Sequence, residues 1–157
     1  MSSHKRRAYV FALSLAAASV AQAAGGYAVY ESNAAFEDVM EGLKAAIGER
    51  GMYINNIMHM GEMLERTGKD LGLGGAVYAK AESIEFCSAA LSRKMTEEQP
   101  ARIVNCPFIV SVYVLPGEPG KTYVVHREVP PDQVADSAVM AEVADNLKAI
   151  AEAAVAW

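Results

Sequence analysis

The segment ESIEFCSAALSRKM (Glu82 to Met95), followed closely by IVNCPFIVSVYVL (Ile103 to Leu115), decides the fold of this chain. Its pattern predicts a strand, a helix and a second strand. From Phe108 to Val114 every second residue is Phe or Val, and this alternation is typical of an antiparallel strand with one dry face. Cys87 ends the first strand and Cys106 precedes the second. Both cysteines therefore belong to one structural unit.

The rest of the chain predicts a single two-layer α+β domain. The loop from Pro116 to Gly120 has the composition of a hairpin turn, so the two strands that it joins are antiparallel. We expect a mostly antiparallel sheet of about five strands with helices packed largely on one face. The expected elements are strands at 27–30, 52–60, 84–87, 107–115 and 121–128, and helices at 33–48, 61–71, 88–95 and 132–157.

The first 23 residues resemble a cleaved secretory signal peptide. Lys5, Arg6 and Arg7 form a basic start, an apolar stretch follows, and Ala21-Gln22-Ala23 is a small-x-small cleavage site. The stretch is too short and too rich in Ala for a stable membrane anchor. The arginine pair fits export by the twin-arginine route as well as by the Sec route. We expect a periplasmic or secreted protein whose single domain spans residues 24–157.

Charge argues against nucleic acid as a partner. Loss of the three basic residues with the signal leaves 11 Lys and Arg against 19 Asp and Glu, a net charge of −8. Such a domain repels a phosphate backbone, because binding there requires a basic surface. We therefore expect no nucleic acid and, after cleavage, no stable membrane span.

The two cysteines predict a disulfide, because an even count in an exported protein favours a covalent pair. If the strands next to Cys87 and Cys106 are antiparallel neighbours, both residues lie at one end of the sheet, and His126 is expected at that end too. A parallel crossover would place them at opposite ends. Three alternatives remain: ligation of a soft ion such as Cu(I) or of zinc, a redox-active pair, and unpaired structural thiols.

A second cluster predicts metal or haem binding. Ile57-Met58-His59-Met60 is followed by Met63, and thioether and imidazole groups are ligands of copper and of haem iron. The candidate ligands are Met58, His59, Met60, Met63 and His126. Alternatively, the methionines fill gaps in the core and the histidine makes a local hydrogen bond. Covalent haem attachment lacks its C-x-x-C-H motif.

Three segments resemble an uncharacterised bacterial family, the domain of unknown function numbered 302. They are HMGEMLERTG (His59 to Gly68), EFCSAALSR (Glu85 to Arg93) and NCPFIVSVYVL (Asn105 to Leu115). The resemblance covers residues 36–127 and implies a small α+β domain. The family pattern has a His at the end of the second strand and a Pro before the fourth, which His59 and Pro107 match.

The chain departs from that pattern at its cysteines. Cys87 stands where many relatives carry a Gly-Asn-Pro turn, and Cys106 directly precedes the matched proline. The resemblance therefore implies an exported, two-cysteine branch, and it implies no activity.

Three functions are compatible with the sequence. The first is a periplasmic binding or accessory protein that holds copper, haem or a small ligand, or docks onto a redox partner. The second is a redox enzyme that depends on a thiol or a His, and the third is a homo-oligomeric module that dimerises through the C-terminal helix. Hydrolytic chemistry has no support, because the sequence lacks a Ser nucleophile motif and a metalloprotease motif.

Overall fold

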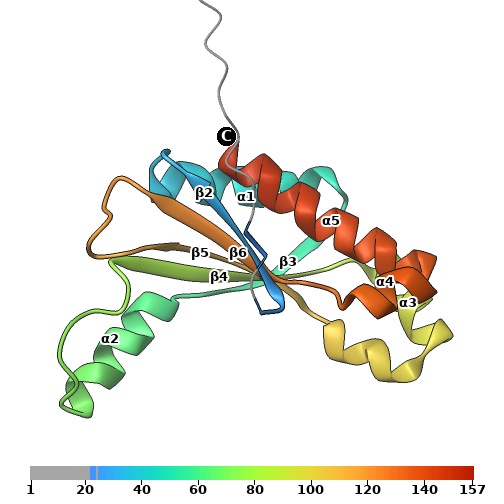
Figure 1. The fold of residues 1–157 in the computed structure, drawn as a ribbon, viewed down its shortest axis with the longest axis horizontal. Coiled ribbons are helices and arrows are strands. Elements are labelled where there is room, and N and C mark those ends of the chain that lie inside the picture. The colour runs from blue at the N-terminus through green and yellow to red at the C-terminus, as the bar shows by residue number, and fades with distance from the viewer. Residues whose placement is uncertain (1–21, 24) are drawn as a thin grey trace, which may run out of the picture.

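The computed structural model describes residues 22, 23 and 25–157 (Figure 1). The expected signal peptide lies almost wholly outside these residues. In chain order the elements are β1 (Gln22–Ala23), β2 (Tyr27–Ser32), α1 (Phe36–Glu49), β3 (Tyr53–Met58), α2 (Met60–Asp70), β4 (Lys80–Cys87), α3 (Ala89–Glu98), the 3-10 helix η1 (Pro100–Asn105), β5 (Phe108–Val114), β6 (Thr122–Arg127), α4 (Pro131–Asp136) and α5 (Ala138–Val155).

The strands form one antiparallel sheet in the order β1-β2-β6-β5-β4-β3. Five strands have six or more residues, and β1 adds two residues at one edge. The expected α+β fold with its mostly antiparallel sheet is confirmed. At the other edge, β3 shifts register between Ile54 and Asn56, which marks a bulge or irregularity in this strand.

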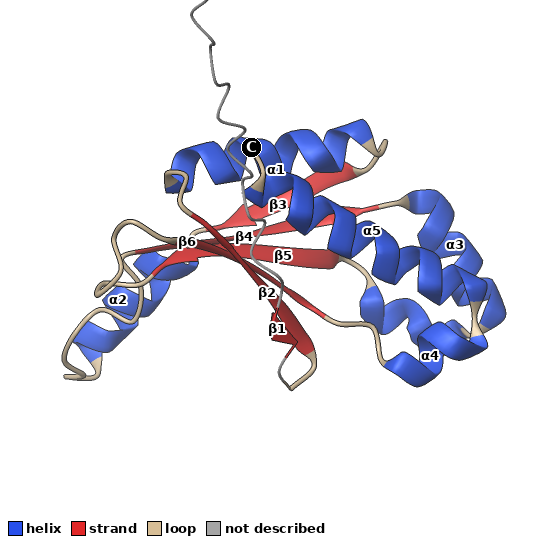
Figure 2. Ribbon diagram, turned by 45° about the horizontal axis from the view of Figure 1, so that its top comes forward, coloured by secondary structure: helices blue, strands red, loops and turns tan. Residues whose placement is uncertain are grey.

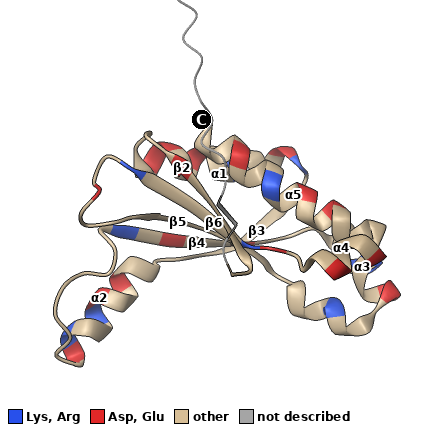
Figure 3. Ribbon diagram, in the orientation of Figure 1, with Lys and Arg blue, Asp and Glu red and all other residues tan. Residues whose placement is uncertain are grey.

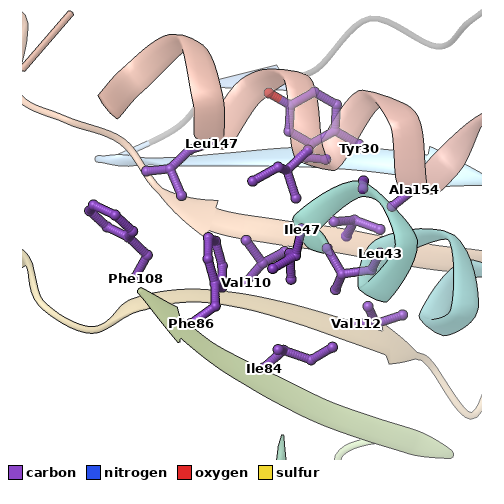
Figure 4. Close-up of a cluster of buried hydrophobic side chains, with 14 of the residues drawn as sticks. Tyr30, Leu43, Ile47, Ile84, Phe86, Phe108, Val110, Val112, Leu147 and Ala154 are labelled. Carbon is purple, nitrogen blue, oxygen red and sulfur yellow. The ribbon is translucent and has the colours of Figure 1, made fainter. Parts of the chain in front are cut away.

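Helices α1 and α5 cover one face of the sheet (Figure 2). Each helix buries the apolar face that its sequence predicts, and these faces pack against the alternate, buried residues of β5. Figure 4 shows the resulting core, in which the rings of Phe86 and Phe108 pack at a tilt of 53° with their centroids 5.8 Å apart. Its fully buried members include Val39, Leu43, Ile47, Ile84, Phe86, Val110, Val112, Val124, Met140 and Ile150.

The opposite face of the sheet is more polar. Tyr113 stacks on Tyr123 with centroids 5.0 Å apart, and the hydroxyl groups of Ser83 and Ser111 lie 2.7 Å apart between β4 and β5. Burial of only one face is what the alternation in β5 predicted.

Most element boundaries shift by one to three residues from the prediction, and two larger differences have a clear structural cause. Strand β4 begins at Lys80, four residues earlier than expected, because its polar first half pairs with Val112 and Val114 of β5. The C-terminal helix is interrupted at Ser137, whose backbone is extended and whose Oγ accepts a hydrogen bond from Met140 N at 3.2 Å. This serine therefore caps a new helix, α5, instead of continuing α4.

Charged residues are dispersed over the domain. In Figure 3 basic and acidic positions are mixed along α2 and α5, and ion pairs such as Lys148–Glu152 join neighbours on one helix. No helix within residues 25–157 is long and apolar enough to cross a membrane.

Candidate functional site

Cys87 and Cys106 meet at one rim of the sheet. Strands β4 and β5 are antiparallel, and their last paired residues at this end are Phe86 and Phe108. Cys87 follows the first of these along the chain, and Cys106 precedes the second by two residues. The expected arrangement at a common end is therefore the one that the structure has.

The hydroxyl group of Ser92 lies between the two sulfurs. Its Oγ is 3.3 Å from Cys87 Sγ and 2.9 Å from Cys106 Sγ. Helix α3 positions this group, because Ser88 Oγ accepts a hydrogen bond from Leu91 N and starts the helix directly after Cys87. Ser92 then lies in the second turn, on the side that faces the cysteines. Ser92 was not among the predicted site residues, although its position one turn into the helix after Cys87 is a signal for it.

Both cysteines are free thiols, so the predicted disulfide is not formed in this structure. Each side chain is half-buried. Burial raises the pKa of the Cys106 thiol, the hydrogen bond with Ser92 opposes this rise, and the neighbouring Cys87 adds to it. At neutral pH Cys106 is therefore held as a neutral thiol.

Exposed apolar side chains surround the thiols. Ile103 and Val104, on η1 just before Cys106, are 66% and 84% exposed. Tyr53, the residue of the edge strand β3 that pairs with Cys87, is 78% exposed. Large apolar residues this open to solvent beside the two thiols are suited to contact another macromolecule.

His59 lies at the other end of the sheet. The residue immediately follows β3 and stands at the N-terminus of α2, with its Nδ1 3.1 Å from Glu82 Oε1. A groove of about 280 Å³ opens beside it between α2 and β4. Lys80 lines this groove, pairs with Glu37 and lies 5.5 Å from the ring centroid of Phe36.

His126 is buried in the helix-covered face of the sheet. Its Nδ1 donates to the carbonyl oxygen of Arg127 at 2.9 Å, and its Nε2 lies 3.4 Å from Tyr30 Oη. Burial lowers the pKa of this imidazole, so the ring is neutral near pH 7. It is packed within the domain, with both ring nitrogens in contact with protein atoms.

The five predicted metal ligands do not converge. The register aligns His126 with Val110, Ile84 and then Ile57 of β3, so His126 is three strand spacings, about 14 Å, from the strand that carries Met58. The remaining candidates, His59, Met60 and Met63, follow one another around the start of α2. Within the described part of the chain, no three His, Cys, Asp or Glu side chains are grouped to hold a metal ion.

The fold and the rim define a small single-sheet α+β protein with paired thiols at one end. The chain belongs to the family described as domain of unknown function DUF302, whose model matches residues 28–156. This match is wider than the expected 36–127, and it includes the first long strand and the C-terminal helix.

A solved structure supports the same fold. The crystal structure of an uncharacterized conserved DUF302 protein from Bacillus stearothermophilus aligns with a TM-score of 0.66. The alignment covers 83% of this chain and 99% of that one, at 16% sequence identity. No curated protein matches this chain.

Proposed function

We propose that this chain is an exported accessory protein that docks onto a redox partner and exchanges a disulfide with it through Cys87 and Cys106. The observation that carries the proposal is the contact of both sulfurs with the single hydroxyl group of Ser92, on a half-exposed rim. Two thiols held this way can be oxidised to a disulfide and reduced again by thiol–disulfide exchange. The disulfide predicted from the sequence is then the oxidised state of the protein, and the free thiols of this structure are its reduced state.

The proposed location agrees with this chemistry. The basic and apolar segments at the start of the sequence are those of an export signal, and disulfides persist in the bacterial periplasm and outside the cell. Ile103, Val104 and Tyr53 provide apolar contact area for a partner beside the thiols.

Capture of a soft metal ion is the competing use of the same thiols. Thiolate sulfur selects Cu(I), so copper is the cofactor that this rim would favour. The cluster around His59 does not strengthen this alternative, because it lies at the opposite end of the sheet from Cys87.

Dimerisation through the C-terminal helix is not part of the proposal. Val143, Leu147 and Ile150 of α5 face the core, so the apolar stripe that suggested a dimer is used inside the domain. Trp157, which follows α5, remains 62% exposed.

The test is a redox titration of the natively exported protein in glutathione buffers of increasing oxidised fraction. Alkylation of free thiols followed by intact-mass measurement counts the thiols at each step. We expect both thiols to be lost together as an intramolecular disulfide and to return on reduction. Oxidation that yields only intermolecular products, or no oxidation at all, would contradict the proposal. Stoichiometric Cu(I) binding without disulfide formation would favour the competing use.

A further inference from the structure

The two thiols of the rim are not equivalent in their surroundings. Cys87 ends β4 and directly precedes Ser88, the residue that caps the ten-residue helix α3. Cys87 is also the thiol next to the exposed Tyr53 of the edge strand.

Cys106, in contrast, is held against the interior of the domain. Its backbone N–H donates to the carbonyl oxygen of Ile103 at 3.0 Å, at the end of η1. Its side chain packs against the hydrophobic core, as that of Cys87 does not. An apolar contact of this kind disfavours a charged sulfur and leaves less of it open to a large partner.

The hydroxyl group of Ser92 lies between the two sulfurs. Its Oγ is within hydrogen-bond distance of both sulfurs, and it is closer to Cys106 than to Cys87, at 2.9 Å against 3.3 Å. A hydroxyl group can donate to one sulfur and accept from the other, and it can exchange these roles by rotation.

We infer that Cys87 is the attacking thiol, that Cys106 is the resolving thiol, and that Ser92 positions the resolving sulfur. This assignment rests on the proposed function. The substrate class is a protein disulfide with apolar surroundings that match Tyr53, Ile103 and Val104.

The exchange balances in two steps. The Cys87 thiolate attacks one sulfur of the partner's disulfide, the partner's S–S bond breaks, and its first sulfur leaves and takes up the proton that Cys87 lost. Cys106, after giving up its proton, attacks the Cys87 sulfur, and the partner's second sulfur leaves and is protonated. Two electrons pass from the cysteine pair to the partner, which departs as a dithiol.

The test uses glutathione disulfide as the probe and intact mass as the measurement, on the full exported protein. Cys106→Ser should accumulate a stable Cys87–glutathione adduct, because no resolving thiol remains. Cys87→Ser should form its adduct roughly tenfold more slowly, because the remaining thiol packs against the hydrophobic core and is less open to attack. Wild type should pass through a short-lived adduct to the intramolecular disulfide. Ala variants at both positions, with far-UV circular dichroism, control for folding.

The outcomes separate this inference from the proposed function. Faster adduct formation by Cys87→Ser, or equal rates in the two variants, would overturn the assignment of roles while the exchange itself stood. Stable adducts on wild type, with no intramolecular disulfide, would overturn both.

Ser92→Ala tests the positioning residue separately. In an otherwise unchanged chain it should prolong the life of the glutathione adduct on Cys87 without changing the stoichiometry of the reaction, and Ser92→Thr should restore resolution. A matched control is Ser83→Ala, which removes a hydroxyl group that faces Ser111 in mid-strand. An adduct that resolves equally fast in Ser92→Ala and wild type would remove Ser92 from the mechanism.

Discussion

Gly42 and Gly48 lie on the same helix, α1, and we predict that the same substitution has opposite effects at the two positions. A Cβ atom added at Gly42 would lie 2.6 Å from Cβ and 2.7 Å from Cγ of Trp157, which is far closer than non-bonded carbon atoms approach. A Cβ atom added at Gly48 meets nothing within 4 Å. Gly48→Ala is therefore the matched control for Gly42→Ala.

The magnitudes follow from helix propensity and burial. Ala is more favourable than Gly inside a helix by up to about 1 kcal/mol, so Gly48→Ala should raise the free energy of unfolding by about 0.5–1 kcal/mol. At Gly42 the same gain is opposed, because the indole must leave its site. Trp157 is 62% exposed, so its removal from α1 uncovers about 75 Å² of a side chain that can bury about 200 Å², at a cost of about 2 kcal/mol. The net effect of Gly42→Ala should be a loss of about 1 kcal/mol.

Urea unfolding measured by far-UV circular dichroism gives both free energies, and fluorescence reports the indole directly, because Trp157 is the single tryptophan of the chain. Emission should shift to the red in Gly42→Ala and stay unchanged in Gly48→Ala. In a Trp157→Ala background, Gly42→Ala should become stabilising like its control. Equal stabilisation by the two single substitutions, with unchanged emission, would refute the reasoning.

Three further predictions concern the core and two titrating groups. Phe86→Ala should lower the free energy of unfolding by about 3–5 kcal/mol, because the ring is fully buried against Phe108; a loss near 1 kcal/mol in urea titration would contradict the packing. The hydrogen bond to Glu118 raises the pKa of Tyr123 to about 12, so Glu118→Gln should return one tyrosine to the range near 10 in ultraviolet absorbance titration. Burial lowers the pKa of His126, so the unfolded chain takes up this proton first. Stability should therefore fall as the pH drops below about 6.5 toward the folded-state pKa, and His126→Asn should remove that part of the slope in denaturant titrations.

Hydrophobic periodicity was sufficient to predict the parts of the fold where one face is buried. Phe108, Val110, Val112 and Val114 alternate because helices cover only one side of β5, and this regularity was visible without coordinates. The first half of β4 shows the limit of the method. Lys80 and Glu82 have side chains that give no strand signal, and only their backbone pairing with β5 makes them part of the sheet.

Polar bonds between residues distant in sequence account for the break in the predicted C-terminal helix. A helical pattern runs through residues 132–157, and nothing in its spacing marks Ser137 as a break. The break depends on bonds to residues distant in sequence, since Ser137 Oγ lies 2.5 Å from Glu98 Oε2 and 3.2 Å from Arg102 Nη1. The candidate metal ligands show the same dependence on contacts between distant residues. Residue types alone suggested the set, but only the strand order shows that His126 is far from Met58.

The thiol rim required two independent conditions, and sequence reasoning could address only one. Antiparallel pairing of β4 with β5 brings Cys87 and Cys106 to one end of the sheet, and a right-handed parallel crossover would have separated them by the length of a strand. The contact with Ser92 depends in addition on where α3 begins. Successive residues of a helix are rotated by about 100°, so a start one residue later would turn Ser92 away from both sulfurs. Ser88 fixes that start by accepting from Leu91 N, and the phase of one short helix thus decides whether the two cysteines share a hydroxyl group.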